Sequence, residues 1–191
     1  MAQIFDLASL TLGDLNATAK GCKTVPFSLA NGAAIFFSTE ALRVVYEPSA
    51  FGDTESTRVN INWRLTDELE ESFGELDEAI LKLVSSQALK LFGAARSIEQ
   101  LRECHTPIVK RSEKWPAQFK AKMNLEEPAK CRIWSEEGQL REPPNPWVNC
   151  LTKPKLRLRS LYIMGRQFGP VLELTDLQIC EESSSVAACP F

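Results

Sequence analysis

Residues 155–177, KLRLRSLYIMGRQFGPVLELTDL, decide the fold of this chain. The first half of the stretch alternates basic and apolar side chains, and neighbours in a strand point to opposite faces of a sheet. Residues 165–169 predict a hairpin turn, and residues 171–179 predict the returning strand. We therefore expect a hairpin with its leucines toward the core and three cations toward solvent, namely Lys155, Arg157 and Arg159.

Two shorter stretches before this hairpin show the same alternation. Residues 118–125 place Phe119 on one face and Lys120 and Lys122 on the other. Residues 130–134 repeat the pattern, with a polar face made by Lys130, Arg132 and Trp134. Three successive strands are therefore expected to carry basic side chains on one face. Trp134 shares its parity with two cations, so burying its ring would also bury their charges.

The first third of the chain predicts further strands. Asn31-Gly32 lies between two apolar runs and is a strong signal for a hairpin turn. The runs with strand-like composition or alternation cover residues 4–12, 25–29, 34–37, 42–46 and 59–65.

One long amphipathic helical segment, about residues 66–103, separates the strand-rich parts. Thr66 is the expected N-cap, and the acids at residues 67–71 suit the positive end of a helix dipole. Apolar residues recur at helical spacing as far as Gly93, which is the expected stop. A shorter helix over residues 97–103 is expected to begin at a serine cap.

The net charge of −3 conceals a segregation of charge. Residues 110–166 hold 13 Lys and Arg against 6 acids, whereas residues 1–109 hold 9 against 15 and residues 167–191 hold none against 4. A basic block within an acidic chain is typical of a protein that meets a polyanion on one face. A solvated basic surface without a partner is the alternative.

Aromatic residues lie in or beside the basic strands. Single-stranded nucleic acids are bound by cations that follow the phosphates, combined with rings on which unpaired bases stack. Packing in the core is the alternative for each ring. The predicted nucleic-acid-binding residues are Lys120, Lys122, Lys130, Arg132, Trp134, Lys153, Lys155, Arg157, Arg159, Tyr162, Arg166 and Phe168.

The order of elements, several strands, a helix and a hairpin-rich remainder, resembles an OB-fold, a small barrel that binds oligonucleotides. The hairpin at residues 155–177 looks like the terminal hairpin of single-stranded-DNA-binding proteins of the phage and large-virus type. The last residues, Pro190 and Phe191, are similar to the end of bacterial single-stranded-DNA-binding proteins. That resemblance implies a tail that recruits replication or recombination proteins. Only Glu181 and Glu182 supply the acidic character of those tails here.

These features predict a β-rich α+β chain, an OB-fold-like five-stranded barrel with additional N-terminal strands and one long amphipathic helix. One nucleic-acid-binding domain is expected over residues 1–180, with a flexible tail at residues 181–191. The expected function is coating single-stranded DNA with little sequence preference, in replication, recombination or repair. Single-stranded RNA is also a possible ligand, because it offers the same phosphates and unpaired bases. A homo-oligomer is compatible with this role. The alternative is a viral structural or assembly protein whose basic face meets a genome or an acidic partner.

No catalytic, cofactor or metal site is expected. His105 is the single histidine and follows Cys104, and sequence neighbours rarely face each other across a catalytic cleft. Cys104 and His105 could bind zinc together with Cys131 or Cys150, but the sequence has no C-x-x-C pair to support such a site. Glycine-rich phosphate-binding loops are also absent from the sequence. Six separated cysteines without a secretory signal predict reduced thiols and an intracellular protein. The apolar runs are too short to span a membrane.

Overall fold

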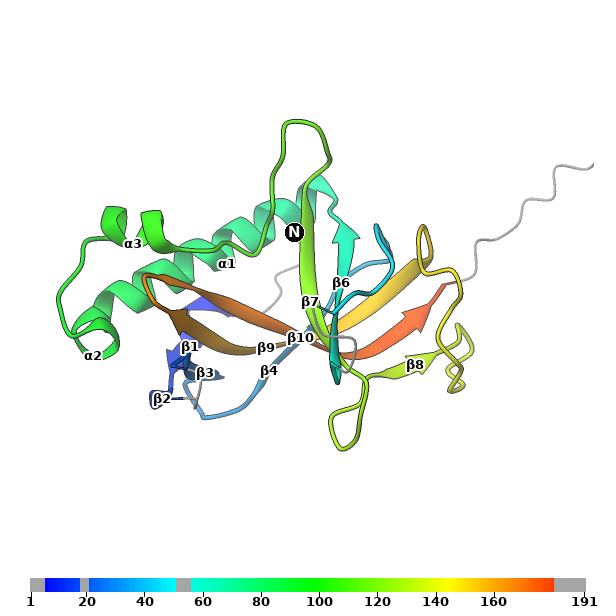
Figure 1. Cartoon of the computed structure of the whole chain (residues 1–191), viewed down its shortest axis with the longest axis horizontal. Coiled ribbons are helices and arrows are strands. Elements are labelled where there is room, and N and C mark those ends of the chain that lie inside the picture. Colours follow the sequence, from blue (N-terminus) through cyan, green and yellow to red (C-terminus); the bar gives the residue numbers. More distant parts are fainter. Residues whose placement is uncertain (1–5, 18–20, 51–55, 181–191) are drawn as a thin grey trace, which may run out of the picture.

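Two long antiparallel strands form the spine of the fold. The computed structural model describes residues 6–17, 21–50 and 56–180, which form an open mixed sheet with helices packed against it (Figure 1). The spine consists of β9 (Leu151–Met164) and β10 (Gln167–Ile179), joined by a turn at Gly165 and Arg166. Gly165 has φ of 61°, a conformation that glycine adopts without strain. The hairpin predicted from the sequence is confirmed.

The free edge of β9 collects the strands of the first third of the chain. The strands β3 (Lys23–Leu29), β4 (Ile35–Ser38) and β5 (Leu42–Arg43) pair with β9 one after another. The turn at Asn31-Gly32 forms, with φ of 80° at Gly32, but β3 and β4 do not pair with each other as a hairpin would. The 14 residues of β9 offer an edge long enough to satisfy the backbone groups of both strands.

The N-terminal strand is shorter than its sequence predicts. A 3₁₀ turn, η1 (Leu7–Ser9), occupies the middle of the predicted strand, and of its described residues, 6–12, only β1 (Leu10–Leu12) forms a strand. Asp6 caps this turn, because its carboxylate accepts a hydrogen bond from the Ala8 N–H at 3.0 Å. Both β1 and β2 (Asn16–Ala17) pair with β3.

The opposite edge of β10 pairs with two strands in parallel. These are β7 (Gln118–Asn124) and β8 (Arg132–Trp134), and β6 (Arg58–Arg64) pairs antiparallel with β7. The resulting strand order is β1-β3-β9-β10-β7-β6. The β-rich fold is therefore confirmed, while this open path does not confirm the predicted five-stranded barrel.

Three helices lie between β6 and β7, where one long helix and a shorter one were expected. They are α1 (Asp67–Ser86), α2 (Ala88–Phe92) and α3 (Ile98–Cys104), and Gln87 interrupts the first two. The predicted caps are confirmed: Thr66 accepts the Leu69 N–H, and Gly93 ends α2 in the left-handed conformation. Ser97 and Gln100 form a capping box at the start of α3. No described helix is long and apolar enough to cross a membrane.

Helix α1 covers one face of the sheet and leaves the other face for polar residues. The ring of Phe73 lies 5.0 Å from that of Phe119, which stacks on Trp63 at 5.1 Å. The Trp63 indole N–H donates to Thr152 Oγ1 at 2.9 Å, so its polar atom is satisfied within the core. We call the uncovered side, which carries the side chains of Lys120, Lys122 and Arg157, the outer face.

Candidate nucleic-acid interface

A groove opens where β7 separates from β10. The two strands pair at only two positions, Lys122 with Glu173 and Met123 with Leu174. Toward their N-terminal ends they diverge, so that β7 and the β9–β10 hairpin form the two arms of a V (Figure 1). The space between the arms contains a cavity of about 570 Å³.

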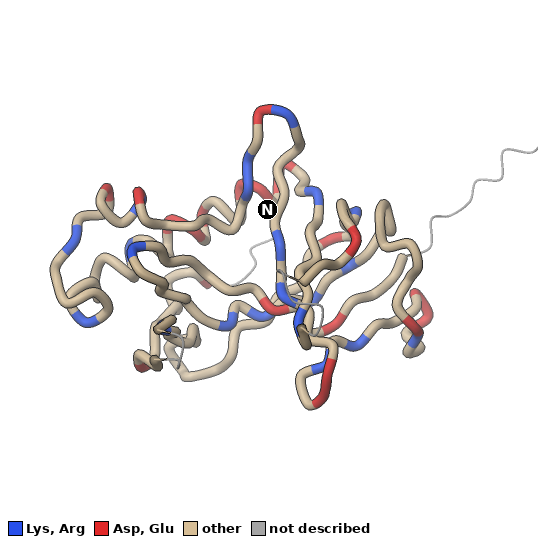
Figure 2. The backbone as a smooth tube through the Cα atoms, in the orientation of Figure 1, with Lys and Arg blue, Asp and Glu red and all other residues tan. Residues whose placement is uncertain are grey.

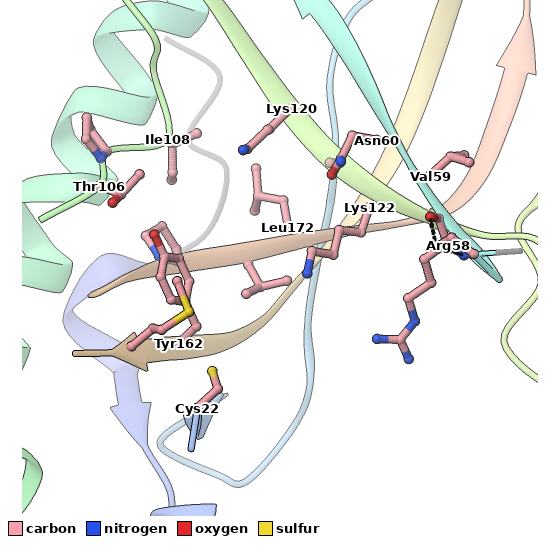
Figure 3. A pocket seen from close by; sticks show the side chains of 16 residues that line it. Cys22, Arg58, Val59, Asn60, Thr106, Ile108, Lys120, Lys122, Tyr162 and Leu172 are labelled. Atoms are coloured by element: carbon pink, nitrogen blue, oxygen red, sulfur yellow. Dashed lines mark hydrogen bonds between the residues drawn. The ribbon is translucent and has the colours of Figure 1, made fainter. Parts of the chain in front are cut away.

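Cations line one wall of the groove, and a tyrosine lines the other. Lys120 and Lys122 project from β7 with Arg58 of β6 beside them, and Tyr162 of β9 lies on the opposite side (Figure 3). Burial, together with the charges of Arg58 and Lys120, lowers the pKa of Lys122. An anion placed in the groove would restore the favourable environment of this ammonium group. The groove therefore combines an aromatic surface with positive charge.

The segment after α3 supplies the floor of the groove. The Ile108 N–H donates to Asp77 Oδ2 at 2.9 Å, which ties this segment to α1. Thr106 approaches the hairpin so closely that a Cβ atom at Gly169 would lie 2.6 Å from its carbonyl oxygen. The same Cβ atom would lie 3.1 Å from the Tyr162 ring. A glycine at this position therefore lets the floor pack directly behind the tyrosine.

Polar and basic side chains continue across the outer face from the groove. Cross-strand pairing places one row of residues over β6, β7, β10, β9 and β4: Asn60, Lys122, Glu173, Arg157 and Phe36. Figure 2 shows the basic segments of β7 and β9 near the centre of the molecule, where this row crosses the sheet. The Arg157 guanidinium lies 5.8 Å from the centre of the Phe36 ring, which is 47% exposed.

The alternation predicted for β9 is confirmed. Leu156 and Leu158 are fully buried, whereas the cations between and before them face outward. Arg166 is exposed at the hairpin turn. The outward cations of β9 are Lys153, Lys155, Arg157 and Arg159.

A buried carboxylate lies inside this basic surface. Glu173 is 6% exposed and accepts hydrogen bonds from Arg159 Nη1 and Asn124 Nδ2, both at 2.6 Å. Because Arg159 is held by this ion pair, part of its charge is neutralised before any ligand binds. The cations of the surface are thus not equivalent.

Trp134 is half buried and contacts a second such carboxylate. Its indole N–H donates to Asp176 Oδ1 at 3.1 Å, and Arg132 Nη2 contacts the same oxygen at 2.7 Å. The Arg132 guanidinium also lies 5.6 Å from the centre of the indole ring, so a cation already occupies one approach to it. Lys130 is exposed in the connection before β8 rather than on the strand.

Phe168 does not belong to the surface. Its side chain is fully buried and packs against Phe92 and His105, with ring centres 5.6 and 5.3 Å away. It pairs with Ile163, whose side chain also faces the core, so the parity that exposes Tyr162 buries Phe168. The predicted tail residues Pro190 and Phe191 lie outside the described residues.

Two residues that line the groove, Arg58 and Thr106, were not predicted from the sequence. Arg58 shares the parity of Asn60 and Asn62, so extending the strand predicted at residues 59–65 by one residue would have found it. Thr106 gives no such signal, because only the packing of the segment after α3 brings it to the cavity.

Comparisons with known proteins support the fold. No family model matches the sequence, and no curated protein is similar to it by sequence. The solved structure of gp2.5, a single-stranded DNA binding protein encoded by bacteriophage T7, is similar with a TM-score of 0.51 and 12% identity, over 80% of this chain and 89% of that chain. The single-stranded DNA-binding protein from bacteriophage Enc34 in complex with ssDNA has a TM-score of 0.48 and 11% identity, over 82% of this chain and 90% of that chain. The likeness to the T7 protein shows a common fold.

Proposed function

We propose that this protein binds single-stranded DNA across the outer face, with the groove between β7 and the hairpin as its central contact. The observation that carries the proposal is the position of Tyr162 opposite Lys120, Lys122 and Arg58. A base stacked on the tyrosine would leave its phosphates beside the cations, which is how single strands are commonly bound. The T7 protein that shares the fold is itself a single-stranded DNA binding protein, which supports the proposal.

In this role the protein coats exposed strands during replication, recombination or repair and acts by binding alone, without catalysis. Contacts to phosphates and ring faces imply little base preference, because every base has a face that can stack. The sheet would then be an expanded relative of the OB-fold barrel.

The stacking contact is tested by two substitutions of one residue. Tyr162→Ala should weaken binding of a labelled oligothymidylate about tenfold, because one stacked base contributes about 1 to 3 kcal/mol. Tyr162→Phe keeps the ring and should bind like the wild-type protein. Fluorescence anisotropy at fixed salt measures both affinities. A duplex of equal length that competes as well as the single strand would rule out the stacking contact.

The phosphate contacts are tested by salt dependence. Replacing Lys120 and Lys122 by alanine should flatten the slope of log affinity against log salt by about 1.4, because each lost phosphate contact on a single strand removes about 0.7. The matched control replaces Lys82 and Lys90, two exposed lysines on α1 and α2, and should leave the slope unchanged. Equal slopes for the two double variants would place the phosphate contacts elsewhere. A wild-type protein that binds no oligonucleotide would favour the assembly role instead.

A further inference from the structure

The loop between α3 and β7 carries an exposed tryptophan that lies outside the groove. Trp115 is 65% exposed, and in the part of the chain that the structure describes its indole has no stacked ring, no cation over it and no hydrogen bond. Indole rings supply large apolar areas and are usually buried or paired. The neighbouring cations are Lys110, Arg111 and Lys114. Glu113 is the acid in the same loop and Arg111 is paired with Glu70, so Lys110 and Lys114 give the surroundings of the bare ring a net positive charge.

The base of this loop is held firmly. The backbones of Lys110 and Gln118 exchange two hydrogen bonds, of 2.7 and 3.1 Å. The Leu65 N–H donates to the Ala117 carbonyl at 2.9 Å, which attaches the loop to the end of β6. Arg111 Nε contacts Glu70 Oε1 of α1 at 2.6 Å. Contacts of this kind hold the backbone at both ends of the loop, so less backbone entropy is lost when a ligand contacts the loop.

The loop also continues the basic wall of the groove. It leads directly into β7, so Trp115 lies five residues before Lys120, a distance of about 16 Å in extended chain. Figure 1 shows the loop as the outer end of the β7 arm of the V. A strand that lies along Lys122 and Lys120 and continues along this arm reaches the loop that carries Trp115.

We propose that Trp115 is a second stacking platform, which holds an unpaired base of the strand where it leaves the groove. This inference rests on the proposed function and extends it, because it assigns a longer footprint and a direction along β7. Lys110 and Lys114 contact the phosphates beside the stacked base. Tyr162 then holds a base inside the groove, opposite the basic wall, and Trp115 holds a base at the outer end of that wall.

The test compares Trp115→Ala with Trp115→Phe on oligothymidylates of about 4 to about 16 nucleotides, the range of site sizes for single-strand-binding folds. Trp115→Ala should lower affinity for the longest strand about tenfold and should reach its maximal affinity at a shorter length than wild type. Trp115→Phe should recover most of the affinity. Leu89→Ala is the matched control, because Leu89 is 69% exposed on α2, outside the groove and the outer face, and it should change neither quantity.

The outcomes separate this inference from the proposed function. If Tyr162→Ala weakens binding and Trp115→Ala does not, the groove is used and the second platform is refuted. If the wild-type protein binds no strand, both proposals fail. If Trp115→Ala instead dissociates a dimer, measured by sedimentation without any strand, and its affinity per chain is unchanged, Trp115 is a contact between copies and the inference is wrong.

Discussion

Asp77 and His105 form a buried pair behind the groove floor, and the pair gives a stability prediction with a defined sign. Asp77 Oδ2 accepts the Ile108 N–H at 2.9 Å, and Oδ1 lies 3.5 Å from His105 Nε2. Burial raises the pKa of Asp77 to about 7, opposed by the hydrogen bond from Ile108, and burial lowers the pKa of His105 to about 4. Between pH 4 and pH 7 both groups are therefore neutral. His105 Nε2 is buried and accepts no hydrogen bond from the described residues. Protonated Asp77 can donate one to it.

Between pH 4 and pH 7, Asp77 and His105 together should make the free energy of unfolding of the wild-type protein nearly independent of pH. The native chain carries its proton on Asp77 and the unfolded chain carries it on His105, so both states bind the same number. In Asp77→Asn only His105 titrates, with a native pKa of about 4 against 6.5. Its stabilising contribution is fully present above pH 6.5 and is lost as the pH falls toward 4. The loss reaches about 3 kcal/mol, at about 1.4 kcal/mol for each unit of pKa.

His105→Gln should give the opposite slope. Asp77 then titrates alone, with a native pKa of about 7 against 3.8. Its stabilising contribution is fully present below pH 3.8 and is lost as the pH rises through 7, by about 4 kcal/mol at most. Urea unfolding at a series of pH values gives both slopes. Variants whose stabilities change in the same direction with pH would refute the neutral pair.

Two further predictions concern stability. Phe168→Ala should lower the free energy of unfolding by about 3 to 5 kcal/mol, because the ring is fully buried. Urea unfolding measures this loss, and a value below about 1 kcal/mol would contradict the place of the ring in the core. Arg159→Ala should cost about 2 kcal/mol, because it leaves the buried Glu173 with Asn124 as its remaining donor. Arg157→Ala on the same strand should cost about 0.5 kcal/mol, and equal costs at both arginines would show that Glu173 does not depend on its ion pair.

Local patterns predicted the strands that have one buried face. The side chains in residues 155–159 alternate because Leu156 and Leu158 pack in the core while the cations stay in water. A run of five residues is long enough to show this alternation in the sequence. The same holds for the helix caps at Thr66 and Gly93, which depend on neighbours in sequence.

Features that depend on distant partners could not be predicted in this way. Glu173 has the spacing of a surface residue, and its burial follows from donors on two other strands, Arg159 and Asn124. The turn at Asn31-Gly32 was predicted, but its flanking strands, β3 and β4, each pair with β9 and not with each other. Both outcomes are set by tertiary contacts that a local pattern does not contain.

The groove exists because β7 pairs with β10 at only two positions, and the buried pair helps to keep the strands apart. Asp77 holds Ile108, and Gly169 admits Thr106, so the floor segment occupies the space in which further pairing of β7 with β10 would otherwise form. Asp77→Asn keeps an oxygen that can accept the Ile108 N–H and an amide that can donate to the imidazole of His105. Its strand affinity at pH above 6.5 should therefore equal that of the wild-type protein. Asp77→Ala removes both contacts, so its affinity should fall together with its stability.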